Sequence, residues 1–239
     1  AANGGAPMGF YPRFTDPAAR REITRYYRFI GKHDALFRGN RSHAEYVLLF
    51  PRKAVHQGKV ESVEVFRRMG RKLLDEHVLF DILPDDLAAA QPKRLAGFRK
   101  VFRVEDGLAG ATTVDGDASR FQAPYTVRIS ASRPAAGSGA GGELDLHLVN
   151  YNRTEPPRGS NGKPSAGGGI KDEKPIAAQS VKVDLLLPEG FDVGRVEVLV
   201  PEWDGPVMPA FRRSGRRVKF EVPGFPVYCV VRVLPKSRP

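Results

Sequence analysis

Two acidic pairs have the residue types needed for acid–base chemistry, Asp85–Asp86 and the pair Glu202 and Asp204. Two carboxylates about 5 Å apart at the mouth of a cleft can break a glycosidic bond, one as acid and the other as nucleophile. Each pair, however, closely follows a proline, where a turn or a helix start is expected. Carboxylates at such positions bind free amide groups of the first helical turn. We therefore name no catalytic carboxylate.

Thiol and imidazole groups give no stronger signal. The single cysteine, Cys229, excludes an internal disulfide framework and a cysteine-based zinc site, and its apolar strand predicts a small buried side chain. His43 and His56 could bracket the C-terminal end of the apolar strand at 44–50, where open parallel sheets place ligands. Nothing with metal-ligand spacing joins them, so we interpret them as loop histidines. His147 alternates with leucines and should be partly exposed or bonded across a sheet. No metal or cofactor is expected.

Sugar binding is the more plausible chemistry, because aromatic rings stack on a pyranose while amide and charged groups bind its hydroxyls. Trp203, the only tryptophan, lies between Glu202 and Asp204, and Asn150 and Tyr151 close a strand-like segment. We name Trp203, Tyr151 and Asn150 as candidate carbohydrate-binding residues. Two structural alternatives stay open: Trp203 could anchor a loop, and Asn150 could satisfy turn amides.

Composition sets the class of the protein. The 239 residues are 41% hydrophobic and 27% charged, which is ordinary for a globular protein. No apolar run approaches the ~20 residues that cross a bilayer, so no membrane span is expected. The net charge of +11 suggests polyanions, but the Arg-rich clusters at 20–21, 67–72 and 212–217 are short and accompany no nucleic-acid motif. We interpret them as solvated faces and predict no specific nucleic-acid binding.

The first half of the chain alternates helical and strand patterns. A helix start at Asp16 and Pro17 predicts a helix over 17–30 that could resume to Phe37. The continuous apolar run at 44–50 predicts a central strand of a parallel sheet. A helix at 60–74, a strand at 78–83, a short helix near 87–90 and a strand at 98–104 follow, with a loop expected around His56. We assign 1–38 to a linker and helix, and 39–110 to an abbreviated flavodoxin-like, three-layer α/β unit.

Beyond residue 107 the apolar period changes from about 3.6 to about 2. Alternating strands are expected at 127–131, 144–148, 181–187, 196–200, 218–222 and 227–233. They predict an antiparallel β-sandwich at 118–239, with a mobile Gly- and Pro-rich loop at 152–179. The fold class is therefore α/β plus all-β.

The order of these features resembles the C-terminal region of glycoside hydrolases, the family 42 β-galactosidases and their relatives. The resemblance is carried by packing and turn patterns at 44–52, 74–86, 144–151 and 196–201. It implies an upstream (β/α)8 barrel that holds both catalytic carboxylates. After the barrel come a class I amidotransferase-like α/β domain, often used for oligomer contacts, and a β-domain.

Two departures from that pattern matter. The α/β part is short, so the helix at 17–37 should pack on its sheet and help to cover it. A working amidotransferase also needs an activated cysteine, and none occurs at 39–110, which rules out glutaminase activity.

The sequence thus predicts a non-catalytic accessory and assembly region of a glycoside-hydrolase-like protein. Because the chain begins Ala-Ala-Asn-Gly-Gly rather than with Met, we expect a catalytic domain before it. Its partners would be that barrel, a second copy of the chain and an oligosaccharide. Alternatives are a stand-alone carbohydrate-binding sandwich and a basic polyanion-binding protein. The compartment stays open between cytoplasm and export.

Overall fold

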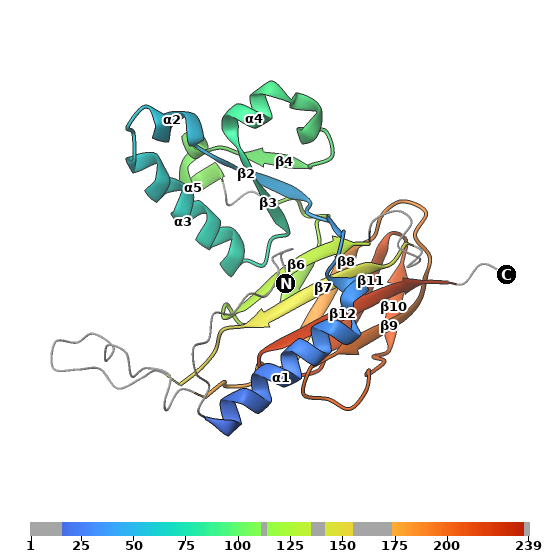
Figure 1. Cartoon of the computed structure of the whole chain (residues 1–239). Helices are drawn as coiled ribbons and strands as arrows, with labels where there is room; N and C mark the ends of the chain where they lie inside the picture. Colours follow the sequence, from blue (N-terminus) through green and yellow to red (C-terminus); the bar gives the residue numbers. More distant parts are fainter. Residues whose placement is uncertain (1–15, 111–113, 135–141, 155–173, 237–239) are drawn as a thin grey trace.

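Alternating apolar residues in the second half of the chain build two antiparallel sheets. The computed structural model describes residues 16–110, 114–134, 142–154 and 174–236 (Figure 1). One sheet has the order β1 (Arg41–Ser42), β6 (Val127–Arg133), β7 (Leu144–Asn150), β12 (Tyr228–Pro235) and β9 (Val193–Leu199). The other has the order β10 (Phe211–Ser214), β11 (Arg217–Val222), β8 (Val181–Leu186) and β5 (Arg120–Gln122). The predicted linker at 1–15 and the middle of the predicted loop, 155–173, lie outside the described residues.

The two sheets pack face to face, because a period of two puts the apolar side chains of each strand on one face. Leu146 of β7, Val183 of β8, Phe220 of β11 and Val231 of β12 belong to the same buried cluster. Cys229 lies in this cluster with no exposed surface, and burial raises the pKa of its thiol well above the usual value. The prediction of a small, buried cysteine is confirmed.

The first half of the chain forms a separate parallel sheet with the order β3 (Phe80–Pro84), β2 (Tyr46–Phe50) and β4 (Lys100–Phe102). Helix α3 (Glu61–Asp75) packs on one face of the sheet, against Leu48. Helix α4 (Asp85–Ala90) packs on the other, against Val47. The prediction that the run at 44–50 is a central strand covered on both faces is confirmed.

Helix α1 (Pro17–Lys32) begins where the sequence predicts, since Asp16 accepts a hydrogen bond from the Ala18 amide at 2.8 Å. It lies across the outer face of the five-stranded sheet (Figure 1), where Phe29 and Leu36 pack on Tyr228 and Val230 of β12. A short 3-10 turn, η1 (Asp34–Leu36), follows it. The expectation that this helix covers the parallel sheet is wrong, because α3 and α4 already cover both faces of that sheet.

Several short elements escape sequence analysis. Strands β1, β5 and β10 have two to four residues, too few to establish a period. Helix α2 (Arg52–His56) occupies part of the segment predicted as a loop. The remaining short segments are η2 (Pro92–Leu95), η3 (Val104–Asp106) and α5 (Gly107–Gly110). The class is nevertheless the predicted mixture of α/β and all-β structure.

None of the helices in the described ranges is both long and apolar enough to cross a bilayer.

Candidate functional site

A cleft of about 740 Å³ lies between the α/β unit and the outer face of β6 and β7. One wall comes from the end of α3 and from β3, and the other from β6, β7 and the connection between α1 and β1. Figure 1 shows the lower end of α3 beside β6, and Arg128 of β6 forms an ion pair at 2.7 Å with Asp75 of α3. The polar residues that line the cleft are Asn40, Ser42, Asp81, Arg128, Ser130, Ser132 and His147.

The floor of the cleft holds a buried hydrogen-bond network around His147, which is only 2% exposed. Its Nδ1 lies 2.7 Å from the Tyr228 hydroxyl and its Nε2 lies 3.1 Å from Ser132 Oγ. Burial lowers the pKa of His147 to about 4, so the ring is neutral at physiological pH. The expectation of partial exposure is wrong, because Phe37 packs against the ring, whereas bonding across the sheet is confirmed.

The Ser132–His147 distance matches that of a nucleophile and its base, but the surroundings do not. A phenol rather than a carboxylate binds the second ring nitrogen, and Ser132 is 9% exposed. We therefore assign this network to holding the cleft wall in place, by joining β6, β7 and β12.

Three polar side chains of the cleft have atoms that can form further hydrogen bonds. Asp81 accepts the Ser42 hydroxyl through Oδ1 at 2.6 Å, and Arg128 contacts Asp75 through one guanidinium nitrogen. No described residue is within hydrogen-bond distance and geometry of the second oxygen of Asp81, the remaining nitrogens of Arg128 or the Ser130 hydroxyl. The cleft can thus donate and accept hydrogen bonds with little net charge.

An exposed aromatic ring also lines the cleft. Tyr151, directly after β7, is 65% exposed. Its backbone is held firmly, because its amide donates to the Thr126 carbonyl at 2.9 Å. The preceding Asn150 donates to the carbonyls of Ile176 and Pro226, both at 2.8 Å, and accepts from the Asn152 amide at 3.0 Å.

A second polar cluster lies on the outer face of the five-stranded sheet. Asp145 of β7 has no exposed surface, and Arg232 of β12 forms ion pairs with Glu143 at 2.5 Å and with Glu197 at 3.1 Å. Neither carboxylate oxygen of Asp145 has a hydrogen-bond partner among the described residues. Burial, reinforced by Glu143, raises the pKa of Asp145 to about 8, so this group is a buried acid rather than an accessible catalyst.

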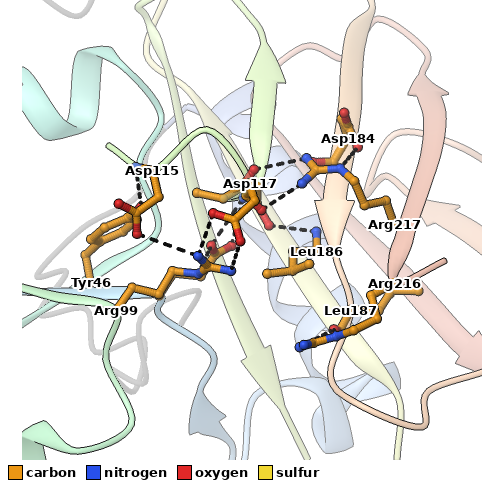
Figure 2. Close-up of polar contacts among 12 residues, drawn as sticks. Tyr46, Arg99, Asp115, Asp117, Asp184, Leu186, Leu187, Arg216 and Arg217 are labelled. Carbon is orange, nitrogen blue, oxygen red and sulfur yellow. Dashed lines mark hydrogen bonds and ion pairs between the residues drawn. The ribbon is translucent and has the colours of Figure 1, made fainter. Parts of the chain in front are cut away.

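The α/β unit is joined to the sandwich by the segment 114–119 (Figure 2). Arg99 forms a two-pronged pair with Asp117 at 2.9 and 3.2 Å and an ion pair with Glu45 at 3.3 Å. Glu45, which is 8% exposed, also accepts the Ser119 amide at 3.1 and 3.2 Å. The Tyr46 hydroxyl accepts the Asp115 amide at 2.9 Å. Strand β2 and the residue before β4 therefore bind the connecting segment directly.

The sandwich binds the same segment from the other side. Arg217 of β11 pairs with Asp184 at 2.7 Å and donates to the carbonyls of Asp117 at 2.7 Å and Ala118 at 3.0 Å (Figure 2). The Ser119 hydroxyl accepts the Leu186 amide of β8 at 2.9 Å. We call residues 114–119 with Glu45, Arg99, Asp184 and Arg217 the joint. The sequence showed no signal for it beyond single charged residues.

The predicted sugar-binding residues are not brought to one place. Trp203 is partly buried and packs against the sandwich core, and the neighbouring Glu202 accepts the Tyr26 hydroxyl at 2.6 Å. Asn150 uses its amide to fix the backbone, the alternative that sequence analysis left open. Tyr151 alone of the three lines the cleft.

The remaining candidates have structural surroundings. Asp86 accepts the Leu87 amide at 2.8 Å and pairs with Arg52 at 2.8 Å, as expected for a helix start. His43 precedes β2 and His56 ends α2, so the two do not bracket one end of the strand. Burial lowers the pKa of His43 to about 4. Over the described part of the chain, no cluster of three or more His, Cys, Asp or Glu could hold a metal ion.

No family model and no curated protein matches this chain. Among solved structures, the chain is similar to α-L-fucosidase isoenzyme 2 from Paenibacillus thiaminolyticus, with a TM-score of 0.60 and 13% sequence identity. The match covers 93% of this chain and 53% of the fucosidase chain, so this chain spans about half the length of that structure. At this identity the likeness concerns the fold alone.

Proposed function

We propose that this chain is the non-catalytic accessory region of a glycoside-hydrolase-like protein that acts on carbohydrate. The observation that carries the proposal is the fold likeness to a fucosidase, because it extends over 93% of the chain and so includes both the α/β unit and the sandwich. A chance likeness to a common sandwich would leave the α/β unit unmatched. The arrangement of the two units is therefore the shared feature.

The chemistry of the cleft supports a non-catalytic role. Asp81 is the one carboxylate among the described residues that line it. Glycoside hydrolysis by the usual route needs two carboxylates that both reach the scissile bond. Glu143 and Asp145, a buried acidic pair, are 2% and 0% exposed and do not line the cleft. The bond-breaking carboxylates would then belong to another part of the protein, for which we propose a (β/α)8 barrel.

The joint supports a role in assembly. Arg99 and Arg217 bind the same connecting segment from the two units, and these contacts would let the two units act as one rigid support. A rigid support can hold a catalytic domain, or a second copy of the protein, in a fixed position. We propose that role here, in line with the family 42 resemblance.

The test is an activity assay of the purified chain with 4-nitrophenyl α-L-fucoside and β-D-galactoside. We expect no release of nitrophenol above the buffer rate. Turnover that survives a second purification and disappears in an Asp81→Asn variant would contradict the proposal, because it would place a catalytic acid inside this chain.

A further inference from the structure

We propose that the cleft between the α/β unit and the β6–β7 face binds a neutral pyranose unit, with Tyr151 as the stacking ring. This inference rests on the proposed function, because it names the ligand class that the accessory region would hold. Trp203, the other aromatic candidate, packs against the sandwich core.

The size of the cleft fits a small ligand. Its volume of about 740 Å³ lies within the range of about 300–1,000 Å³ typical of small-molecule sites. Apolar residues of two units, including Leu74, Phe80 and Val149, supply part of its lining. A pyranose presents a C–H face to such surfaces and a rim of hydroxyls to polar groups.

Tyr151 has the properties of a stacking ring. An isolated exposed aromatic is ordinary on a protein surface, but the Tyr151 ring lines a cleft. The backbone that carries the ring is held by hydrogen bonds of the Asn150 side chain and of the Tyr151 amide. Because this backbone is already ordered before binding, the ligand does not have to offset the conformational entropy that a flexible loop would lose. Stacking on Tyr151 therefore needs little rearrangement of the backbone that carries the ring.

The polar groups of the cleft suit hydroxyls better than a charged ligand. Asp81 offers a carboxylate oxygen, Ser130 a hydroxyl and Arg128 guanidinium protons. Arg128 is already paired with Asp75 at 2.7 Å, so its charge is largely balanced. A phosphate would meet the Asp81 carboxylate, and a cation would meet Arg128. Neutral hydroxyls can bind to all three groups without that penalty.

The test is an NMR titration of the 15N-labelled chain with L-fucose, D-galactose and D-glucose, with glycerol as a polyol that lacks a pyranose ring. We expect at least one sugar to shift the backbone amides of Tyr151, Ser130 and Asp81 with a dissociation constant in the millimolar range or below. Glycerol should leave them unchanged at the same concentrations.

Two variants place the site. Tyr151→Ala should weaken binding at least tenfold, whereas Tyr125→Ala should leave it unchanged, because Tyr125 is 70% exposed but does not line the cleft. Both rings are largely exposed, so both variants should fold, which the amide spectrum itself reports.

Three outcomes would overturn the inference: no sugar shifts these amides, the two tyrosine variants behave alike, or the shifts cluster around Trp203. Failure here leaves the proposed function standing if the chain still lacks hydrolytic activity. Hydrolysis by the isolated chain would instead contradict the proposed function, even with sugar bound in the cleft.

Discussion

Asp145 and His147 show how one packing event changes the chemistry of two side chains. Both alternate with the core leucines of β7 and so point to the outer face of the sheet. The helix α1 and the turn after it lie over that face, which leaves Asp145 with 0% and His147 with 2% exposure. Burial then disfavours the charged form of each group, raising the pKa of the acid and lowering that of the base.

The Asp145 pKa predicts a pH-dependent loss of stability. The folded-state pKa of about 8 is above the unfolded value of about 3.9. The folded chain therefore binds more protons between these values, and the free energy of unfolding falls as pH rises through that window. Asp145→Asn removes this loss. We expect the stability of the variant relative to the parent protein to rise between about pH 4 and about pH 8, in urea unfolding.

The comparison isolates Asp145 from its neighbours. His147 titrates in the opposite sense at lower pH, but it is present in both proteins and cancels in the difference. The charged groups that act on Asp145 are Glu143, directly before β7, and Arg232 on β12, which also pairs with Glu197 of β9. A stability difference between Asp145→Asn and the parent protein that does not vary with pH would mean that Arg232 keeps Asp145 ionised.

At the scale of the elements, the joint depends most on one side chain of the sandwich, Arg217 of β11. It is 22% exposed in its side chain and binds Asp184 and two carbonyls of the connecting segment. Lysine keeps the charge but cannot form the planar, multiple bonds of a guanidinium. Arg217→Lys should therefore lower the free energy of unfolding by about 1–3 kcal/mol, measured by chemical denaturation.

Arg212→Lys on the neighbouring strand β10 is the matched control. Arg212 is exposed, so its replacement should change stability by less than about 0.5 kcal/mol. An equal effect of the two substitutions would show that the carbonyl bonds of Arg217 contribute nothing beyond surface charge.

The elements also show what sequence patterns can and cannot reveal. Strand β2 was predictable because a strand that is buried on both faces needs a continuous apolar run, and the sequence has one at 44–50. The place of α1 was not, since an amphipathic helix shows which face is apolar but not which sheet it will cover. The cleft depends on the same missing information: Tyr151 was found as an aromatic residue at a strand end, but Asp81 and Arg128 face one cavity only after the two units pack.

At the scale of the whole molecule, the α/β unit and the sandwich are held together by polar contacts at separate places. Besides the joint, Asp75 pairs with Arg128, and Nε2 of His77, after α3, lies 2.9 Å from the Ala123 carbonyl. His77 has a positive φ of 56°, a left-handed conformation uncommon for a residue other than glycine. These contacts flank the cleft, so the geometry of the cleft depends on them.

Arg99→Ala tests whether the two units unfold independently. The substitution leaves the carboxylate of Glu45, 8% exposed, without its charged partner and releases Asp117. Removing one partner of a nearly buried pair is costly, and the cost should fall on the unit that holds Glu45. We expect backbone amides of β2 and β4 to exchange with deuterium at least tenfold faster, while amides of β7 and β12 keep their parent rates.

Arg67→Ala, which breaks only the exposed pair with Glu64 on α3, should change neither set. Equal acceleration in both units would instead show that the joint, the parallel sheet and the sandwich open as one cooperative body.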